Sequence, residues 1–232
     1  MNIVRNSPIA IIDSGIGGIS LLKQITKKYP GENYIYIADN EYMPYGNKSA
    51  TFLKNRLLEL VRYLIDTFSV KMVILACHTA SVVSLKYLKN NVDIPVLGLN
   101  LNDYNAPNHK IICTKLTAKK YTNLEVCACS RLAGIIEDNI FDIQTLKRRI
   151  AKMLDRAEID ENNIVLGCTH YELVANVFKQ LYPNKNFVLP CKEFVNSLNL
   201  AKPNGATKGD ILMLSTLATK SYIDKLWKIY RQ

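Results

Sequence analysis

Short apolar runs alternate with amphipathic stretches along most of this chain, and the two patterns predict different elements. In the clearest amphipathic stretch, Ala50–Phe68, the apolar residues recur on one face with the period of a helix. Further helices are expected at Ile19–Lys28, Ala80–Lys89, Phe141–Asp155, Glu172–Leu181 and Leu217–Tyr230. The apolar runs that predict strands are Ile9–Ile12, Tyr34–Ala38, Met72–Ala76, Val96–Leu99, Lys110–Cys113, Leu124–Cys127, Ile164–Gly167, Phe187–Leu189 and Ile211–Leu214. This alternation predicts an α/β fold with parallel sheets that helices cover on both faces.

One strand–cysteine–helix unit occurs in each half of the chain. The first reads Val73-Ile-Leu-Ala-Cys77-His-Thr, and the second reads Ile164-Val-Leu-Gly-Cys168-Thr-His. Ligands of parallel sheets bind at the carboxyl ends of the strands, where both cysteines fall. The repeat can therefore bring two thiols to one cleft from opposite sides, which suits a reaction that removes a proton on one side and returns it on the other.

A length of 232 residues allows one large domain or two of about 100 residues each. Two stretches have the composition of linkers: Asn100–His109, which is rich in Asn, and Ala201–Asp210, which contains Pro and Gly. We expect residues 1–98 together with 208–232 to form a first α/β domain, and residues 99–207 to form a second one. The last helix would then return to the first domain.

Charge and hydropathy narrow the range of partners. Thirty Lys and Arg against twenty Asp and Glu give a formal charge of +10, which can attract either nucleic acid or a small acidic substrate. The densest basic cluster, Lys147, Arg148, Arg149 and Lys152, is better explained as a solvated helix face than as a nucleic-acid site. The chain contains no apolar run of 18 residues and no signal-like apolar segment near Met1, so we expect a cytoplasmic protein with no membrane contact.

Six cysteines in a reducing compartment predict free thiols. The Cys127-x-Cys129 spacing is too tight for the usual zinc pair, and no second pair completes a site, so we expect no metal. For Cys113, Cys127, Cys129 and Cys191 we expect the role of small buried core residues.

Two other strand ends carry polar groups. Asp13-Ser14-Gly-Ile-Gly-Gly18 leads into a helix, and its amides can hold an anion. A tightly packed helix cap explains it equally well, because the GxGxxG order is missing and Asp13 would repel phosphate. The Pro44-Tyr45-Gly46 turn can clamp a carboxylate with its amides and phenol, or be an ordinary surface turn.

Several groups can tune the two thiols. A cysteine at a helix N-terminus has its thiolate favoured by the helix dipole, so we expect the pKa of Cys77 and Cys168 to fall from the ordinary value of about 8.5. His170 can assist Cys168, and Asp13 can assist Cys77. Glu137 is either a support for His170 or a surface charge. The hydroxyl groups expected to bind a carboxylate are those of Ser14, Thr79, Thr114, Thr117 and Thr169.

These residues resemble glutamate racemase, of the cofactor-independent amino-acid racemase superfamily. The matching segments are Ile11–Gly18, Ala38–Ser49, Ala76–Ser81 and Leu166–Tyr171, with weaker matches at Thr114-x-x-Thr117 and Cys129–Glu137. The resemblance implies two pseudo-symmetric α/β domains with parallel-type sheets, the active site in the cleft between them, and a C-terminal helix that completes the first domain.

The resemblance also implies roles. Cys77 and Cys168 would be the two acid/base thiols, assisted by Asp13 and His170 respectively, with Glu137 supporting His170. Glutamate would be racemised without a cofactor, which would supply D-glutamate for peptidoglycan; whether the protein is a homodimer stays open. The residues implied to bind substrate are Ser14, Pro44, Tyr45, Gly46, His78, Thr79, Thr114, Thr117 and Thr169.

Two departures from the family pattern keep alternatives open. Position 78 is His, where relatives usually have Asn, and Leu189-Pro-Cys-Lys192 replaces an Asp-Ser pair. An imidazole at position 78 can narrow the pocket and favour aspartate, or alter the pH profile. The alternatives are an aspartate or other amino-acid racemase, a single-thiol decarboxylase of the same superfamily, and a non-catalytic racemase-like binding protein.

Overall fold

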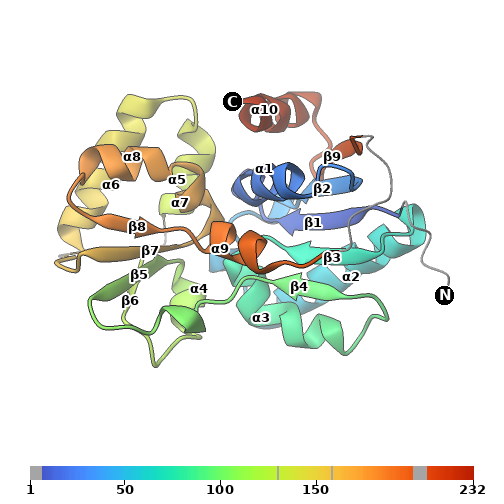
Figure 1. Ribbon diagram of the computed structural model, residues 1–232, viewed down its shortest axis with the longest axis horizontal. Helices are drawn as coiled ribbons and strands as arrows, with labels where there is room; N and C mark the ends of the chain where they lie inside the picture. The colour runs from blue at the N-terminus through green and yellow to red at the C-terminus, as the bar shows by residue number, and fades with distance from the viewer. Residues whose placement is uncertain (1–6, 130, 158, 201–207) are drawn as a thin grey trace.

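The computed structural model describes residues 7–129, 131–157, 159–200 and 208–232. Its described residues form two parallel sheets that lie side by side (Figure 1), with strand orders β4-β3-β1-β2-β9 and β6-β5-β7-β8. The first sheet consists of β1 (Ile9–Asp13), β2 (Tyr34–Ala38), β3 (Met72–Leu75), β4 (Val96–Gly98) and β9 (Ile211–Ser215). The second consists of β5 (His109–Cys113), β6 (Val126–Ala128), β7 (Asn163–Gly167) and β8 (Asn186–Val188). The expected α/β class with parallel sheets is confirmed.

Helices cover both faces of the first sheet because its strands are apolar on both sides. Along β1, Ile9 and Ile11 face one core and Ala10 and Ile12 face the other. The first core is closed by α1 (Ile19–Lys28) and α10 (Lys220–Arg231), and the second by α2 (Ala50–Phe68) and α3 (His78–Lys89). The C-terminal chain therefore returns to the first sheet, where β9 pairs with β2 and α10 packs beside α1 (Figure 1).

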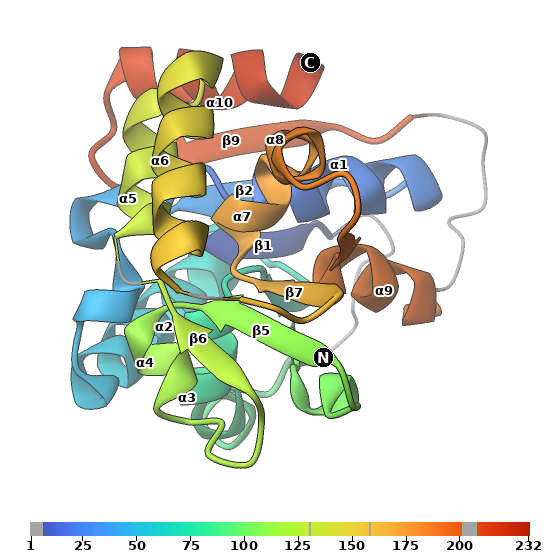
Figure 2. The same ribbon diagram turned by 90° about the vertical axis from the view of Figure 1, so that its left-hand side faces the viewer.

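The second sheet is covered mainly on one face. There, α5 (Leu132–Asn139), α6 (Ile143–Arg156), α7 (Thr169–Leu173) and α8 (Ala175–Leu181) enclose a core with residues of β5 and β7 (Figure 2). A smaller cluster lies on the opposite face, beside the short helix α4 (Lys115–Ala118). Three short 3₁₀ turns occupy Asn40–Tyr42, Tyr45–Asn47 and Asn102–Tyr104.

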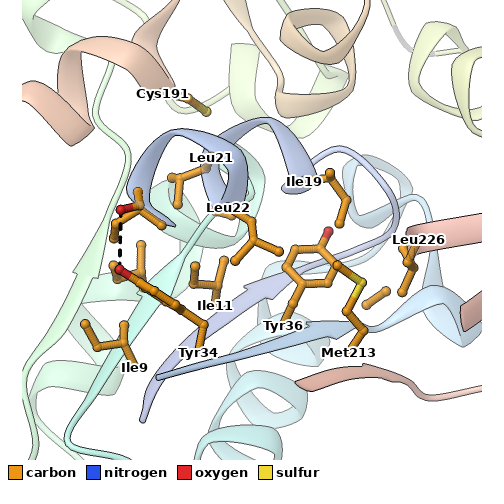
Figure 3. Close-up of a cluster of buried hydrophobic side chains, with 14 of the residues drawn as sticks. Ile9, Ile11, Ile19, Leu21, Leu22, Tyr34, Tyr36, Cys191, Met213 and Leu226 are labelled. Atoms are coloured by element: carbon orange, nitrogen blue, oxygen red, sulfur yellow. Dashed lines mark hydrogen bonds between the residues drawn. The ribbon is translucent and has the colours of Figure 1, made fainter. Parts of the chain in front are cut away.

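One helix that follows the second sheet packs on the first half. In α9 (Pro190–Ser197), Cys191 reaches α1, where its sulfur lies 3.8 Å from Ser20 Oγ (Figure 3). The buried Glu172 accepts the Cys191 N–H at 3.0 Å, so a carboxylate from α7 caps the N-terminus of α9. Burial is the largest influence on Glu172 and raises its pKa to about 8.

The observed elements correct several expectations. The predicted helix Glu172–Leu181 is two helices that are interrupted at Val174, and the predicted helix at Ala80 begins two residues earlier, at His78. The amphipathic pattern did not predict α5 or α9. Cys127 is half-buried rather than a core residue, because its short strand β6 lies at the edge of the second sheet. The suggested linker Ala201–Asp210 lies mostly outside the described residues.

Candidate active site between the two sheets

Each cysteine of the repeated unit caps the helix that follows a strand. Cys77 joins β3 to α3, and Cys168 joins β7 to α7. Both residues are 6% exposed. Negative charge on Cys168 is a minor contribution to the raised pKa of Cys77.

The surroundings of Cys77 overturn one expectation. Burial, and then the negative charge of Asp13, raise the pKa of the Cys77 thiol instead of lowering it. Hydrogen bonds from the backbone amides of Ala80 and Thr79 oppose the rise but do not reverse it. The dipole effect expected at the N-terminus of α3 is therefore weaker than the cost of a buried thiolate.

Asp13 connects the two halves at the end of β1. Its Oδ1 accepts the Gly15 N–H at 2.9 Å, and its Oδ2 accepts the Thr169 hydroxyl, also at 2.9 Å. Burial raises the pKa of Asp13, while the positive charge of His170 and the two hydrogen bonds lower it. Both Asp13 and its neighbour Ser14 are buried.

The Glu137 carboxylate is held by donors from three elements. His170 Nε2 lies 2.9 Å from Oε2, and the Ile16 N–H donates to the same oxygen at 3.0 Å. Tyr222 of α10 donates its hydroxyl to Oε1 at 2.8 Å, and Lys225 Nζ contacts both Oε1 and the backbone carbonyl of Glu137. Glu137 therefore supports His170 and is not a surface charge.

The pKa of Glu137 is lowered and the pKa of His170 is raised. Burial alone would raise the pKa of Glu137, but the hydrogen bond and charge of His170, together with the Ile16 amide and Lys225, lower it to about 2. Burial would likewise lower the pKa of His170, yet its hydrogen bonds with Cys168 and Glu137 raise it well above the usual 6.5. The structure thus places an imidazolium beside the Cys168 sulfur.

Sequence reasoning missed Tyr222 and Lys225. They follow Glu137 by 85 and 88 positions and belong to no motif. The expectation that the last helix returns to the first half was the one available signal, but a returning helix does not reveal which side chains reach the site.

The glycine-rich turn after β1 packs closely against the start of α7. A Cβ atom built on Gly17 would lie 2.5 Å from His170 Nδ1 and 2.7 Å from Thr169 Oγ1. Real Cβ atoms do not approach so closely, so only glycine lets this turn lie against α7. The tight packing expected of the turn is observed, although Gly18, the N-cap residue of α1, receives no side-chain hydrogen bond.

Three threonine hydroxyls from the two halves of the chain meet close to the start of α3. Thr79 Oγ1 lies 2.9 Å from Thr114 Oγ1 and 3.0 Å from Thr117 Oγ1, and the latter two are 3.0 Å apart. Thr79 comes from α3, Thr117 from α4, and Thr114 is the N-cap residue of α4, directly after β5. Gly46 closes against this triad, since a Cβ atom there would lie 2.7 Å from Thr114 Cβ.

A hydrogen bond and an ion pair hold the Pro44-Tyr45-Gly46 turn in place. Tyr45 donates its hydroxyl to Asp39 Oδ2 at 2.6 Å, and Asp39 is ion-paired with Arg56 at 2.8 Å. The Tyr45 phenol, expected to face a carboxylate, therefore donates to a carboxylate of the protein itself. Pro44 follows a cis peptide bond from Met43.

His78 occupies the first position of α3, between Cys77 and Thr79. It is 3% exposed, and neither ring nitrogen has a hydrogen-bond partner among the described residues. Burial lowers its pKa to about 3, so the ring is neutral at physiological pH. A neutral imidazole has one donor and one acceptor nitrogen, and both are available here for a bound molecule.

The described residues contain no cluster of three or more metal-ligating side chains. Within the same ranges, no helix is both long and apolar enough to cross a membrane.

Fold and site together define a class of protein: two parallel α/β sheets, each with a buried cysteine at the start of a helix that follows one of its strands. No family model matches the chain. It is 33% identical over 227 residues to the glutamate racemase of Buchnera aphidicola subsp. Schizaphis graminum, a match that covers 88% of this chain and 89% of that protein. The chain belongs to the glutamate racemase family.

Solved structures agree on the fold. A glutamate racemase isoform from Bacillus anthracis superposes with a TM-score of 0.81 at 23% identity, covering 98% of this chain and 95% of that one. The glutamate racemase of Francisella tularensis subsp. tularensis in complex with D-glutamate superposes with a TM-score of 0.80 at 22% identity, covering 99% and 95%.

Proposed function

We propose that this protein interconverts L- and D-glutamate without a cofactor, by proton transfer between the substrate and two cysteines. The observation that carries the proposal is the placement of Cys77 and Cys168. Each is buried at the start of a helix that follows a parallel strand, one in each sheet. Asp13, on the strand beside the one that leads to Cys77, accepts a hydrogen bond from Thr169, the neighbour of Cys168.

In the proposed reaction, one cysteine thiolate takes the α-proton, and the opposite thiol gives its proton to the other face of the α-carbon. The product has inverted configuration, and the two sulfurs have exchanged protonation states. The reverse reaction uses the same groups with their roles exchanged. General acid–base transfer of this kind contributes about 10²- to 10⁴-fold to a rate.

The neighbours of the thiols differ, and we assign them different tasks. The His170 imidazolium beside Cys168 compensates negative charge on that sulfur, and Glu137 holds the imidazolium in place. The raised pKa of Cys77 makes it the proton donor of the resting enzyme, and the nearby Asp13 keeps the thiol form favoured until substrate arrives. In this scheme Tyr222 and Lys225 are positioning residues that act through Glu137.

The substrate would be held by the polar groups around the thiols. The Thr79, Thr114 and Thr117 hydroxyls satisfy one another in this structure, and a carboxylate placed among them would accept hydrogen bonds from all three. We assign further contacts to the side chains of Ser14, His78 and Thr169 and to the backbone of the Pro44-Tyr45-Gly46 turn, where Tyr45 and Gly46 carry the amide donors.

Burial of this site serves the chemistry. An amino acid α-carbon is weakly acidic, so the developing negative charge needs fixed donors and little competing water. The side chains assigned to proton transfer and substrate binding are buried, apart from the Pro44 and Gly46 positions of the turn, which are half-buried. Substrate entry then requires the two halves to separate, which would break the Asp13–Thr169 contact.

We also propose the division of the chain that this mechanism needs. Residues 1–98 with 208–232 form one domain and residues 99–207 form the other. In the cell, the protein would be cytoplasmic and supply D-glutamate for peptidoglycan; a homodimer is compatible with this scheme but is not required by it.

His78 favours a second candidate substrate. Its buried ring is larger than the Asn that relatives usually carry, and both its nitrogens lack partners among the described residues. A shorter acidic amino acid such as aspartate would leave room for the ring.

The test is a substrate panel with purified protein and no added cofactor, followed by circular dichroism. L-glutamate and D-glutamate should each converge on a racemic mixture, and faster conversion of aspartate would move the assignment to that substrate. Failure of every amino acid in the panel to racemise would refute the proposed activity.

A further inference from the structure

The helices α5 and α6 pack against each other near the end of β6 (Figure 2). Residues of these three elements and of the loops beside them line a cavity of about 590 Å³. None of the residues assigned to the racemase site lines it. On α5, the cavity-lining Ile135 lies on the opposite helix face from Glu137, because positions two apart are separated by about 200° around a helix.

Four cationic side chains surround this cavity, which we call the basic cavity: Arg131, Arg149, Lys152 and Arg156. No carboxylate lines it among the described residues, and none of the four cations forms an ion pair within the described part of the chain. The basic cavity therefore holds a local excess of positive charge that the described residues leave uncompensated.

The placement of these cations is unfavourable for the helices that carry them. Arg149, Lys152 and Arg156 follow one another at spacings of three and four on α6, so like charges are neighbours on one helix face. Arg131 is the N-cap residue of α5, where the helix dipole disfavours a cation. A bound anion would relieve both repulsions.

The basic cluster seen in the sequence is divided by the fold. Arg149 and Lys152 line the basic cavity, whereas their neighbours Lys147 and Arg148 do not. The expected solvated face is observed, because Arg148, Arg149 and Lys152 are exposed and Lys147 is half-buried. Arg149 and Lys152 also line the basic cavity together with Arg131 from a different helix.

The interior of the basic cavity is less polar than its edge. Leu132, Ile135 and Met153 contribute apolar surface, and Cys127 and Cys129 contribute sulfur. A hydrogen bond from Cys129 is the main factor that lowers the pKa of Cys127, so one thiolate can be present, but the cations still outnumber it. The volume lies within the range of about 300–1,000 Å³ that small-molecule sites occupy.

We propose that the basic cavity binds a small molecule that carries two or more phosphate groups on an organic body. The phosphates would contact the arginine and lysine side chains, since guanidinium groups match phosphate oxygens in geometry and charge. The organic body would lie on the apolar and sulfur-lined interior. The proposal does not depend on the racemase assignment, because the two sites share no residue.

The test compares two double variants that remove the same charge from α6. Arg149→Gln/Lys152→Gln changes the basic cavity, and Lys147→Gln/Arg148→Gln is the matched control outside it. Calorimetric titration at about 0.15 M salt, where weak surface attraction is screened, would use ADP and inorganic tripolyphosphate as probes. Arg131→Gln, on α5, provides an independent variant if the α6 double variant does not fold.

We expect ADP to bind the unchanged protein, with affinity at least about tenfold weaker in the cavity variant and within about twofold in the control. Tighter binding of ADP than of tripolyphosphate would show that the organic body contributes; equal binding would support phosphate recognition alone. ADP should also slow the alkylation of Cys127 by iodoacetamide, followed by mass spectrometry. The proposal is overturned if neither probe binds, if both double variants lose affinity equally, or if Cys127 is not protected.

Discussion

Replacing Glu137 by Gln removes the charge of the carboxylate that holds His170 while keeping nearly the same shape. The pKa of Glu137 is lowered from an ordinary 4.5 to about 2. At 1.36 kcal/mol for each pKa unit, this fall corresponds to about 3 kcal/mol of stability that the ionised carboxylate supplies at pH 7. Loss of one partner from a buried ion pair typically costs about 3–5 kcal/mol, so the two figures agree in size.

The pH dependence has a definite sign. Because the pKa is lower in the folded protein than in the unfolded chain, the stabilisation by Glu137 is fully present above pH 4.5 and is lost as the pH falls through about 2. The difference in unfolding free energy between the unchanged protein and Glu137→Gln should therefore be about 3 kcal/mol at pH 7 and about half that at pH 3.

Urea unfolding provides the assay, followed by the fluorescence of Trp227 and by far-ultraviolet circular dichroism. Coincident transitions in the two signals would justify a two-state analysis. Glu59→Gln is the control, because the Glu59 side chain is 70% exposed and its pair with Arg56 should contribute less than about 1 kcal/mol. The reasoning fails if Glu137→Gln costs no more than the control, or if its cost is the same at pH 7 and pH 3.

Three further substitutions probe the site from different sides. Tyr222→Phe should lower kcat roughly tenfold with little change in KM, and it should shift the pH profile of kcat, because the Tyr222 hydroxyl acts only through Glu137. An unchanged pH profile would show that the role of Tyr222 is merely structural. His78→Asn should raise kcat/KM for glutamate relative to aspartate in a circular dichroism assay, and an unchanged ratio would show that position 78 does not set specificity. Gly17→Ala should abolish racemisation and lower the free energy of unfolding in urea by about 1–3 kcal/mol, since the added methyl group meets His170. An unchanged free energy of unfolding would contradict the packing described for this turn.

The sequence was sufficient for the strands and for most of the helices. The strand Tyr34–Ala38 and the helix Ala50–Phe68 are observed with the predicted bounds, because long or uniformly apolar segments carry a strong periodic signal. The helices α5 and α9 were missed because each has only eight residues, too few for a clear period. The break between α7 and α8 falls at Val174, a residue of the second core. No Gly or Pro stands at this position, so the sequence carried no signal for the break.

The candidate site divides in the same way. Cys77, Cys168 and Asp13 could be found because each stands at the end of an apolar run, where a polar or reactive residue is conspicuous. The contacts of Tyr222 with Glu137 and of Thr79 with Thr117 join segments that lie far apart in the chain. No local sequence pattern can therefore predict them. The raised pKa of Cys77 could not be anticipated, since it depends on burial and on Asp13 in three dimensions.

The most direct measurement of the two-thiol mechanism is racemisation of L- and D-glutamate in deuterated buffer by Cys77→Ser and Cys168→Ser, with incorporation of deuterium at the α-carbon followed by mass spectrometry. The unchanged protein should form product that carries one deuterium, and each variant should lose at least about a hundredfold in rate while remaining folded. Cys127→Ser, which alters a half-buried thiol outside the site, should retain activity. Full activity in either Cys77→Ser or Cys168→Ser would contradict the account.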